Sequence, residues 1–396
     1  MGAGKLKTSA VHAGAAVPQS KAVSISPPVH LASVSYFERA EDLDHSLDGA
    51  DFVYGRNRAQ NAELLEEAIA SLEGGEACAA FATGMAALRA VLEVQPLSRG
   101  DRVVITSAGY GTTRVLYKTA LAARGVELQA FALVEPAAAE KIAALQPKFV
   151  LAESITNPLI SVADVRAIAK ACKQVGAVFA VDATFASPVL QRPLELGADY
   201  AIHSTTKWIN GHGDAMGGVV SGTRERIEPL KNARVLTGSI LGPFEAWLTL
   251  RGLRTLPVRM KAHCEHAESV ARRLLESPAV ERVLYPSLTS HPTHAVARQV
   301  LDGGFGGMLA FELRGAGRAE SFRFLERVKL AKPAPSLGDV ATLVMHAATA
   351  SARRLTAAER EAAGIGENLI RVSVGLEDPD DIADDLLAAI SQAVER

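Results

Sequence analysis

One lysine of this chain stands in a setting that suits covalent chemistry. Lys207 follows the hydroxyl residues Ser204 and Thr206 and precedes a glycine-rich bend that begins at Gly211. A lysine held there could form a Schiff base, and the hydroxyl groups could contact a phosphate. Upstream, Asp182 ends an apolar run, where a carboxylate could stay ionised and keep a ring nitrogen protonated. Together these residues predict pyridoxal phosphate (PLP) as the cofactor.

A second phosphate contact is expected where Thr83-Gly84-Met85 lies between an apolar run and a helical pattern. Backbone N–H groups at the start of that helix would point at an anion, and the glycine would let the anion come close. Because glycine before a helix is common, this interpretation depends on Lys207. The same holds for the hydroxyl residues beside the lysine.

Further positions could contact a cofactor, although each also has a simpler explanation. Tyr110 follows an expected strand end, where its ring could stack on a planar cofactor or simply fill the core. Asn157 precedes a proline in a turn signal, and its side chain could reach the ring oxygen of a cofactor. The guanidinium of Arg56, near Tyr54, could bind phosphate, but composition alone favours a surface loop here.

An arginine inside an apolar strand pattern points to the substrate. Arg371 lies within Leu369-Ile370-Arg371-Val372-Ser373, and a buried charge without a partner is costly. It could bind a substrate carboxylate or form an internal salt bridge, and the sequence leaves both open. The histidines show no metal-ligand spacing with a third ligand, so we expect no metal site.

Charge balance and cysteine usage narrow the functional class. The chain has 396 residues, with 42 Lys and Arg against 44 Asp and Glu. This balance argues against a nucleic-acid or membrane-surface binder and favours a small molecule and other subunits as partners. Three scattered cysteines, in no CxxC spacing, suit a reducing cytoplasm. We expect no secretory signal in residues 1–14 and no membrane span.

Apolar strands alternate with helical patterns over most of the chain, which predicts an α/β fold. Residues 1–60 look irregular and should form an N-terminal arm. Residues 61–250 should form a large PLP-binding domain with a mostly parallel sheet, and residues 251–396 a smaller C-terminal α/β domain. The expected strands cover 102–106, 128–133, 149–153, 177–182, 200–203, 217–221, 280–285, 308–313, 343–346 and 369–374.

Active sites in such sheets lie at the carboxyl ends of the strands, where Glu153, Asp182 and the segment after His203 all fall.

Helical patterns separate the expected strands. A long helical pattern over 245–278 is interrupted near Pro257. The other expected helices cover 62–72, 86–92, 112–123, 137–145, 162–175 and 381–394.

Short motifs in order along nearly the whole chain resemble the Cys/Met-metabolism family of PLP enzymes. That family includes cystathionine γ-synthases, cystathionine lyases, methionine γ-lyases and O-acylhomoserine sulfhydrylases. So many ordered matches are highly specific. The matching stretches are Tyr54-Gly55-Arg56, Leu72-Glu73-Gly74-Gly75, Thr83-Gly84-Met85-Ala86, Tyr110-Gly111, Glu153-Ser154-Ile155-Thr156-Asn157-Pro158, Val181-Asp182-Ala183-Thr184-Phe185, His203-Ser204-Thr205-Thr206-Lys207, Asn210-Gly211-His212-Gly213-Asp214, Arg251-Gly252-Leu253-Arg254-Thr255-Leu256 and Arg371-Val372-Ser373-Val374-Gly375-Leu376-Glu377-Asp378.

The resemblance implies a fold-type I enzyme, similar to aspartate aminotransferase, and usually a homotetramer built from two catalytic dimers that share active sites. It implies that Lys207 forms the Schiff base, that Asp182 faces the pyridine nitrogen and that Tyr110 stacks on the ring. Arg371 would hold the substrate carboxylate, with Asn157 and Ser336 nearby. The implied phosphate contacts are Gly84, Met85, Ser204 and Thr206, with Tyr54 and Arg56 reaching the phosphate of the neighbouring subunit.

The resemblance also implies γ-elimination or γ-replacement on a homoserine-type or sulfur-containing amino acid, with Lys207 moving protons and Tyr110 donating one. Departures fall where the distal part of the substrate should lie. Thr112 stands where methionine γ-lyases have cysteine, and Ala341 where many members have a glutamate. The missing carboxylate disfavours cystathionine, which has a distal ammonium group. The leaving group stays open, as do β-elimination from cysteine or cystathionine and a non-catalytic PLP-fold binding or regulatory protein.

Overall fold

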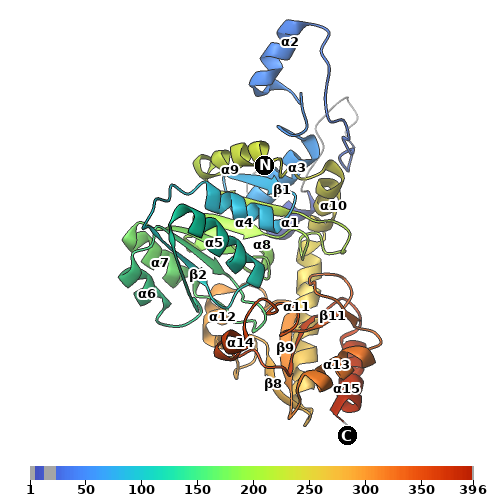
Figure 1. Ribbon diagram of the computed structural model, residues 1–396. Helices are drawn as coiled ribbons and strands as arrows, with labels where there is room; N and C mark the ends of the chain where they lie inside the picture. Colours follow the sequence, from blue (N-terminus) through green and yellow to red (C-terminus); the bar gives the residue numbers. More distant parts are fainter. Residues whose placement is uncertain (1–4, 13–23, 395–396) are drawn as a thin grey trace.

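Two β-sheets, each covered by helices, organise the chain in its computed structural model (Figure 1). The structure describes residues 5–12 and 24–394. The expected arm therefore lies partly outside the described residues, at 1–4 and 13–23. Of the helices within the described ranges, none has the length and apolar character that crossing a bilayer would require.

In the described part of the chain, seven strands form the larger sheet in the order β1-β7-β6-β5-β4-β2-β3. The neighbours from β6 to β3 pair in parallel, whereas β7 runs antiparallel to both β1 and β6. The α/β class and the mostly parallel sheet expected from the sequence are confirmed. The strands are β1 (Ala77–Phe81), β2 (Arg102–Thr106), β3 (Glu127–Phe131), β4 (Phe149–Glu153), β5 (Val178–Asp182), β6 (Tyr200–His203) and β7 (Gly218–Gly222).

Successive side chains of these strands pack on opposite layers of helices. In β2, Val103 and Ile105 face one layer, and Val104 between them faces the other. Because both faces are covered, the strands read as continuous apolar runs rather than as alternating ones. The first layer contains α4 (Gly84–Glu93), α5 (Gly111–Arg124) and α9 (Arg224–Thr237), and the second contains α3 (Gln60–Glu73), α6 (Ala138–Leu145), α7 (Val165–Val175), α8 (Ser187–Leu190) and α10 (Pro243–Leu253).

A smaller sheet follows in the C-terminal part, with the order β10-β11-β12-β9-β8. Its strands pair antiparallel except for β10 and β11. Helices α13 and α15 pack on it in one apolar cluster. The elements are β8 (Val280–Leu284), α12 (His294–Val300), β9 (Met308–Leu313), α13 (Arg318–Arg327), β10 (Lys332–Pro333), β11 (Leu343–His346), α14 (Ala357–Ala362), β12 (Leu369–Ser373) and α15 (Pro379–Val394).

One helix belongs to the cores of both sheets. In α11 (Leu256–Leu275), the first half buries Leu256 and Met260 in the core beside the large sheet. The second half buries Val270 and Leu274 against the small sheet. Pro257 lies in its first turn, which explains the interruption seen in the sequence pattern.

Elements that the sequence pattern did not predict are short or lack a strong apolar signal. The strand β1 is mostly alanine and has no β-branched residue, so only its pairing with β7 defines it. The arm is not irregular throughout, which corrects that expectation. It contains α1 (Leu6–Val11), which buries Ala10 in the core, and α2 (Ala40–His45), which stands away from the body of the molecule in Figure 1. The charge-rich helices α9, α13 and α14, and the short α12, were also missed.

Candidate active site

Lys207 lies in a tight turn that follows β6 at the carboxyl edge of the large sheet. Its Nζ donates a hydrogen bond to Ser336 Oγ at 2.9 Å. Burial, together with the positive charge of Arg371, lowers the pKa of Lys207 to about 8. A fair share of this amine is therefore neutral near physiological pH, and the neutral amine is the form that attacks a carbonyl.

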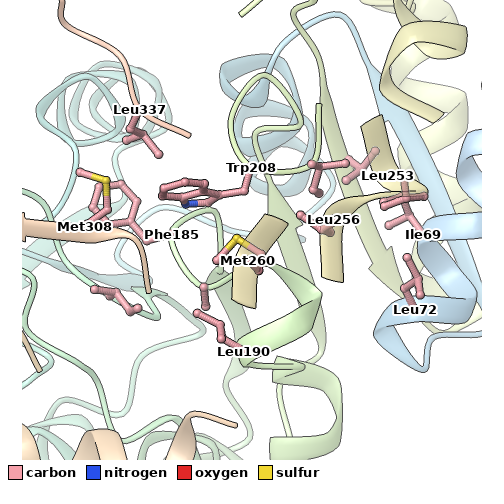
Figure 2. Close-up of a cluster of buried hydrophobic side chains, with 14 of the residues drawn as sticks. Ile69, Leu72, Phe185, Leu190, Trp208, Leu253, Leu256, Met260, Met308 and Leu337 are labelled. Carbon is pink, nitrogen blue, oxygen red and sulfur yellow. The ribbon is translucent and has the colours of Figure 1, made fainter. Parts of the chain in front are cut away.

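The next residue anchors the lysine turn in the core. Trp208 is 1% exposed and packs with Phe185, Met260 and Leu337 in the cluster of Figure 2. The backbone of Gly338 also presses on this turn, since a Cβ there would lie 2.6 Å from the Trp208 amide nitrogen. The lysine backbone is consequently held between the large sheet and the segment that carries Ser336.

Two carboxylates stand side by side at the carboxyl ends of β4 and β5, where Glu153 and Asp182 are register partners. Thr184 donates its hydroxyl to Asp182 Oδ1 at 2.5 Å and its N–H to the same oxygen at 3.0 Å. Burial raises the pKa of Asp182, and these hydrogen bonds and the nearby His203 oppose that rise. Burial and the charge of Asp182 raise the pKa of Glu153 to about 8. The pKa of each carboxyl group is thus raised, and the two hydrogen bonds from Thr184 favour the ionised form of Asp182.

The start of α4 offers a place for an anion. The Thr83 side chain caps this helix, but the N–H groups of Gly84 and Met85 have no acceptor among the described residues. A Cβ at Gly84 would lie 2.8 Å from the Cβ of Ser204, so a larger residue would displace the turn behind it. Free N–H groups at a helix N-terminus favour a bound phosphate.

Arg371 is a buried cation without an acidic partner. It is 3% exposed on β12, and no carboxylate pairs with it among the described residues. Its Nη1 donates to Asn157 Oδ1 at 3.1 Å and its Nη2 to the Ser336 carbonyl at 2.7 Å, while Nε has no partner in the same ranges. The internal salt bridge that the sequence left open is therefore not formed there, and the guanidinium is free to bind a carboxylate.

Tyr110 is placed by one of the two carboxylates. Its N–H donates to Glu153 Oε1 at 2.5 Å just before α5 begins. The preceding Gly109 allows this approach, because a Cβ there would lie 2.7 Å from Glu153 Oε1. The Tyr110 side chain is half-exposed and borders the cavity that contains Lys207.

A cavity of about 210 Å³ unites most of the predicted site. Ser336 joins it through its hydrogen bond to Lys207. Tyr54 and Arg56 lie elsewhere, in a separate hollow where Arg56 donates to the Val235 carbonyl at 3.2 Å. The predicted residues that line the cavity are Gly84, Met85, Tyr110, Asn157, Asp182, Ser204, Thr206, Lys207 and Arg371.

Several residues that line this cavity were not predicted as site residues, and two of them, Glu153 and Thr184, contribute polar side chains beside Asp182. The strand-end rule placed Glu153 at this edge of the sheet, as it did Asp182, but no contact with cofactor or substrate was predicted for Glu153. Thr184 gives no such signal, because a threonine two residues after an aspartate is common. Across residues 5–12 and 24–394, no cluster of three His, Cys, Asp or Glu side chains could hold a metal ion.

Comparison with known proteins supplies the deciding observation. A family model described as Cys/Met metabolism PLP-dependent enzyme matches residues 7–391. The chain belongs to this family. As a Cys/Met metabolism enzyme it is a fold-type I protein, and its cofactor is PLP.

Relatives within the family align over most of their length. An O-succinylhomoserine sulfhydrylase of Pseudomonas aeruginosa is 40% identical over 339 residues, which is 86% of this chain and 83% of that protein. An L-methionine γ-lyase of Pseudomonas putida is 38% identical over 391 residues, covering 98% of this chain and 96% of the relative. The crystal structure of a cystathionine γ-synthase from Xanthomonas oryzae pv. oryzae in complex with cystathionine matches with a TM-score of 0.92, at 37% identity and 98% coverage of both chains.

The pocket of this Cys/Met metabolism enzyme fits PLP on three independent grounds. Asp182 is a half-buried carboxylate that lines the cavity and has no ion-pair partner in the described residues, as a protonated ring nitrogen would require. The free N–H groups at the start of α4 suit the phosphate. The lowered pKa of Lys207 suits an amine that must react with an aldehyde.

Proposed function

We propose that this enzyme removes or replaces the substituent on the γ-carbon of an L-amino acid of the homoserine or methionine type. The observation that carries the proposal is Arg371, a buried guanidinium with no acidic partner among the described residues, in the same cavity as Lys207. A substrate carboxylate would neutralise it. The γ-lyase activity named for the Pseudomonas putida relative supports the γ-position.

The pocket residues divide into those that would hold the cofactor and those that would hold the substrate. Lys207 would carry PLP covalently, Asp182 would meet the ring nitrogen and Tyr110 would cover one face of the ring. Arg371, with Asn157 and Ser336, would hold the substrate carboxylate. The proposed phosphate contacts are Gly84, Met85, Ser204 and Thr206, with Tyr54 and Arg56 of a second subunit.

In this proposal each residue has a separate task. Bound PLP supplies an electron sink that makes the C–H bonds near the substrate amino group acidic. Arg371 fixes the carboxylate so that the Cα–H bond faces Lys207, whose Nζ removes that proton and then one from the β-carbon. Asp182 stays ionised, so that the ring nitrogen keeps its proton. The Tyr110 hydroxyl donates a proton to the departing γ-substituent.

A substrate panel tests the proposal. The purified holoenzyme would be mixed with L-methionine, O-acetyl-L-homoserine, O-succinyl-L-homoserine, L-cysteine and L-cystathionine, and the 2-oxo acids would be identified. γ-Elimination consumes water and releases 2-oxobutyrate, ammonia and the protonated substituent. With an added thiol, replacement would form a thioether at the expense of 2-oxobutyrate. Pyruvate as the main product would overturn the γ-assignment.

The role of the lysine is tested separately. Lys207→Ala should lose both turnover and the visible absorbance of protein-bound PLP, whereas Lys118→Ala, at an exposed position on α5, should keep both. Turnover that persists in Lys207→Ala would contradict the assignment. Circular dichroism would establish that both variants are folded.

We further propose a homotetramer of two catalytic dimers in the cytoplasm, with 61–250 as the PLP-binding domain and 251–396 as the C-terminal domain. Exposed apolar side chains on the arm favour an active site shared between subunits. Ile25 and Tyr36 are 92% and 89% exposed, and both suit burial against a second copy of the chain. Three free, buried cysteines suit a reducing compartment. Light scattering measures the molar mass and hence the number of subunits. A monomer that binds PLP with full affinity would refute the shared site.

A further inference from the structure

An arginine on α11 packs against the turn that carries Lys207. Arg259 is 6% exposed, and no carboxylate pairs with it among residues 5–12 and 24–394. Burial lowers the pKa of Arg259 to about 10, so its guanidinium still carries a charge near neutral pH. A buried cation without an acidic partner is costly unless other acceptors satisfy its N–H groups. The acceptors that Arg259 uses therefore indicate what it holds in place.

The Arg259 guanidinium donates hydrogen bonds to the lysine turn and to the end of α10. Nη1 donates to the Trp208 carbonyl at 2.8 Å, and Nη2 donates to the carbonyls of Ile209 at 3.3 Å and Gly252 at 2.8 Å. Nε donates to Thr255 Oγ1 at 3.1 Å. Gly252 lies in the last turn of α10, where backbone carbonyls favour a nearby cation. The guanidinium therefore joins the lysine turn to the end of this helix.

The turn does not satisfy these carbonyls by itself. Its Gly211 N–H donates to the Lys207 carbonyl at 2.8 Å. The carbonyls of Trp208 and Ile209, which come directly after the lysine, accept no backbone hydrogen bond in the described part of the chain. Arg259 is the donor to both of them. It thereby fixes the two peptide planes that follow Lys207.

Two glycines allow this close contact. A Cβ at Gly211 would overlap the Arg259 guanidinium, and a Cβ at Gly252 would overlap the Asn210 carbonyl. Gly211 also has a φ of 77°, which glycine adopts readily. The guanidinium and the end of α10 are thus in direct contact with the backbone of the turn.

We propose that Arg259 is a positioning residue that, through the Trp208 and Ile209 carbonyls, fixes the direction in which the Lys207 side chain leaves the turn. This inference rests on the proposed transfer of the substrate Cα proton to Lys207 Nζ. During that transfer the amine is not bonded to the cofactor, so its reach depends on the backbone that carries it. Burial and Arg371 account for the lowered pKa of Lys207, so Arg259 acts through geometry rather than charge. A misplacement of about 1 Å can slow such a step by about 100-fold.

Hydrogen exchange at the Cα of L-alanine isolates this step. L-alanine has no leaving group, so in D₂O the holoenzyme should replace its Cα proton by a deuteron through Lys207, which proton NMR measures. Arg259→Met keeps a long side chain but removes its donors, and should lower the maximal exchange rate by about 10- to 100-fold. Arg259→Lys can still donate to a carbonyl and should lose about three- to tenfold. In both variants the half-saturating L-alanine concentration should stay within about threefold of wild type, because Arg371 still binds the carboxylate.

Two further measurements do not depend on turnover. In amide hydrogen exchange of the holoenzyme, a peptide that spans residues 204–213 should exchange about tenfold faster in Arg259→Met than in wild type. The pH midpoint at which PLP-free protein binds PLP should be the same in both, since that midpoint follows the pKa of Lys207. A shifted midpoint would assign Arg259 an effect of charge and overturn the positioning role.

Other variants control for stability and for surface charge. Leu274→Ala opens a cavity at a residue of α11 that is 0% exposed in the small-sheet core, and should lower the thermal midpoint without changing either exchange rate. Arg272→Met removes an exposed charge of the same helix and should change neither rate nor midpoint. Thr255→Val removes the acceptor of Arg259 Nε at an exposed position. It carries the test if Arg259→Met does not fold, with an expected loss of about two- to threefold in L-alanine exchange.

Failure of this inference can be told apart from failure of the proposed function. Wild-type exchange of L-alanine in folded Arg259→Met, or in Thr255→Val, would overturn the positioning role while the γ-chemistry stands. A loss in Leu274→Ala equal to that in Arg259→Met would assign the arginine to stability alone and also overturn it. If wild type exchanges L-alanine but forms pyruvate as its main product from the substrate panel, the γ-assignment fails and the role of Arg259 stands. If Lys207→Ala exchanges L-alanine as fast as wild type, the proposed role of the lysine fails and this inference fails with it.

Discussion

Replacing Arg371 tests whether a buried cation without an acidic partner is the anchor of the substrate. Its Nη1 donates one hydrogen bond to Asn157 and its Nη2 donates one to the Ser336 carbonyl. The Nε–H and the remaining Nη hydrogens are left to donate to a substrate. A carboxylate can therefore accept two charge-assisted hydrogen bonds, at about 1.5–3 kcal/mol each. Arg371→Gln should lower kcat/KM by about 10²- to 10⁴-fold.

Arg371→Lys separates charge from geometry. Lysine keeps the charge but cannot donate two parallel bonds, so its loss should be about 10- to 100-fold. The assay is 2-oxo acid release over a range of L-methionine concentrations, with absorbance and circular dichroism to show that the cofactor is bound and the protein folded. 3-(Methylthio)propylamine, which lacks the carboxylate, should bind the wild type and Arg371→Gln alike. A folded, PLP-loaded Arg371→Gln variant within about threefold of wild type would refute the anchor.

Three further outcomes follow from the geometry of the cavity. Burial and the charge of Arg371 lower the pKa of Lys207 to about 8, so its amine becomes neutral as pH rises through 8. The rate at which PLP-free protein binds PLP should therefore rise with pH and level off above that value. Arg371→Gln removes the nearby positive charge and should move the midpoint of this pH profile upward. Thr184→Val removes the hydroxyl that donates to Asp182 and accepts from the Ser204 N–H at 2.8 Å, and fluorescence titration should show PLP affinity falling by about tenfold. Trp208→Ala leaves a cavity in the core beside the lysine, and thermal unfolding should report a loss of about 3–5 kcal/mol in stability.

The grouping of most candidate site residues in one cavity could be predicted from the sequence because several of them lie at strand ends. Asp182 ends β5, and the turn with Lys207 begins after β6, so the parallel register brings them to one edge. Arg371 was predicted as a buried arginine, but whether it meets an acid depends on which segments pack against β12. That long-range contact is set by the packing of the two sheets and has no local signal.

Other features could not be predicted from local sequence for similar reasons. The alanine-rich β1 forms only because β7 provides an edge to pair with. The hydrogen bond from Tyr110 to Glu153 joins residues 43 positions apart. The contact between Arg354 and the start of α5 likewise joins segments far apart in the chain and has no local signal. The sequence thus indicates which groups lie at strand ends better than it indicates which distant groups they contact.

The helix shared by both cores has a mechanical consequence. Since α11 is continuous from Leu256 to Leu275 and is packed at both ends, bending between the sheets would break buried contacts in either core. The spacing between the Lys207 amine, in the turn after β6 of one sheet, and the Arg371 guanidinium, on β12 of the other, is thereby set during folding. Ligand capture should then leave the relative orientation of the sheets unchanged, and any tightening should come from peripheral turns such as 350–355.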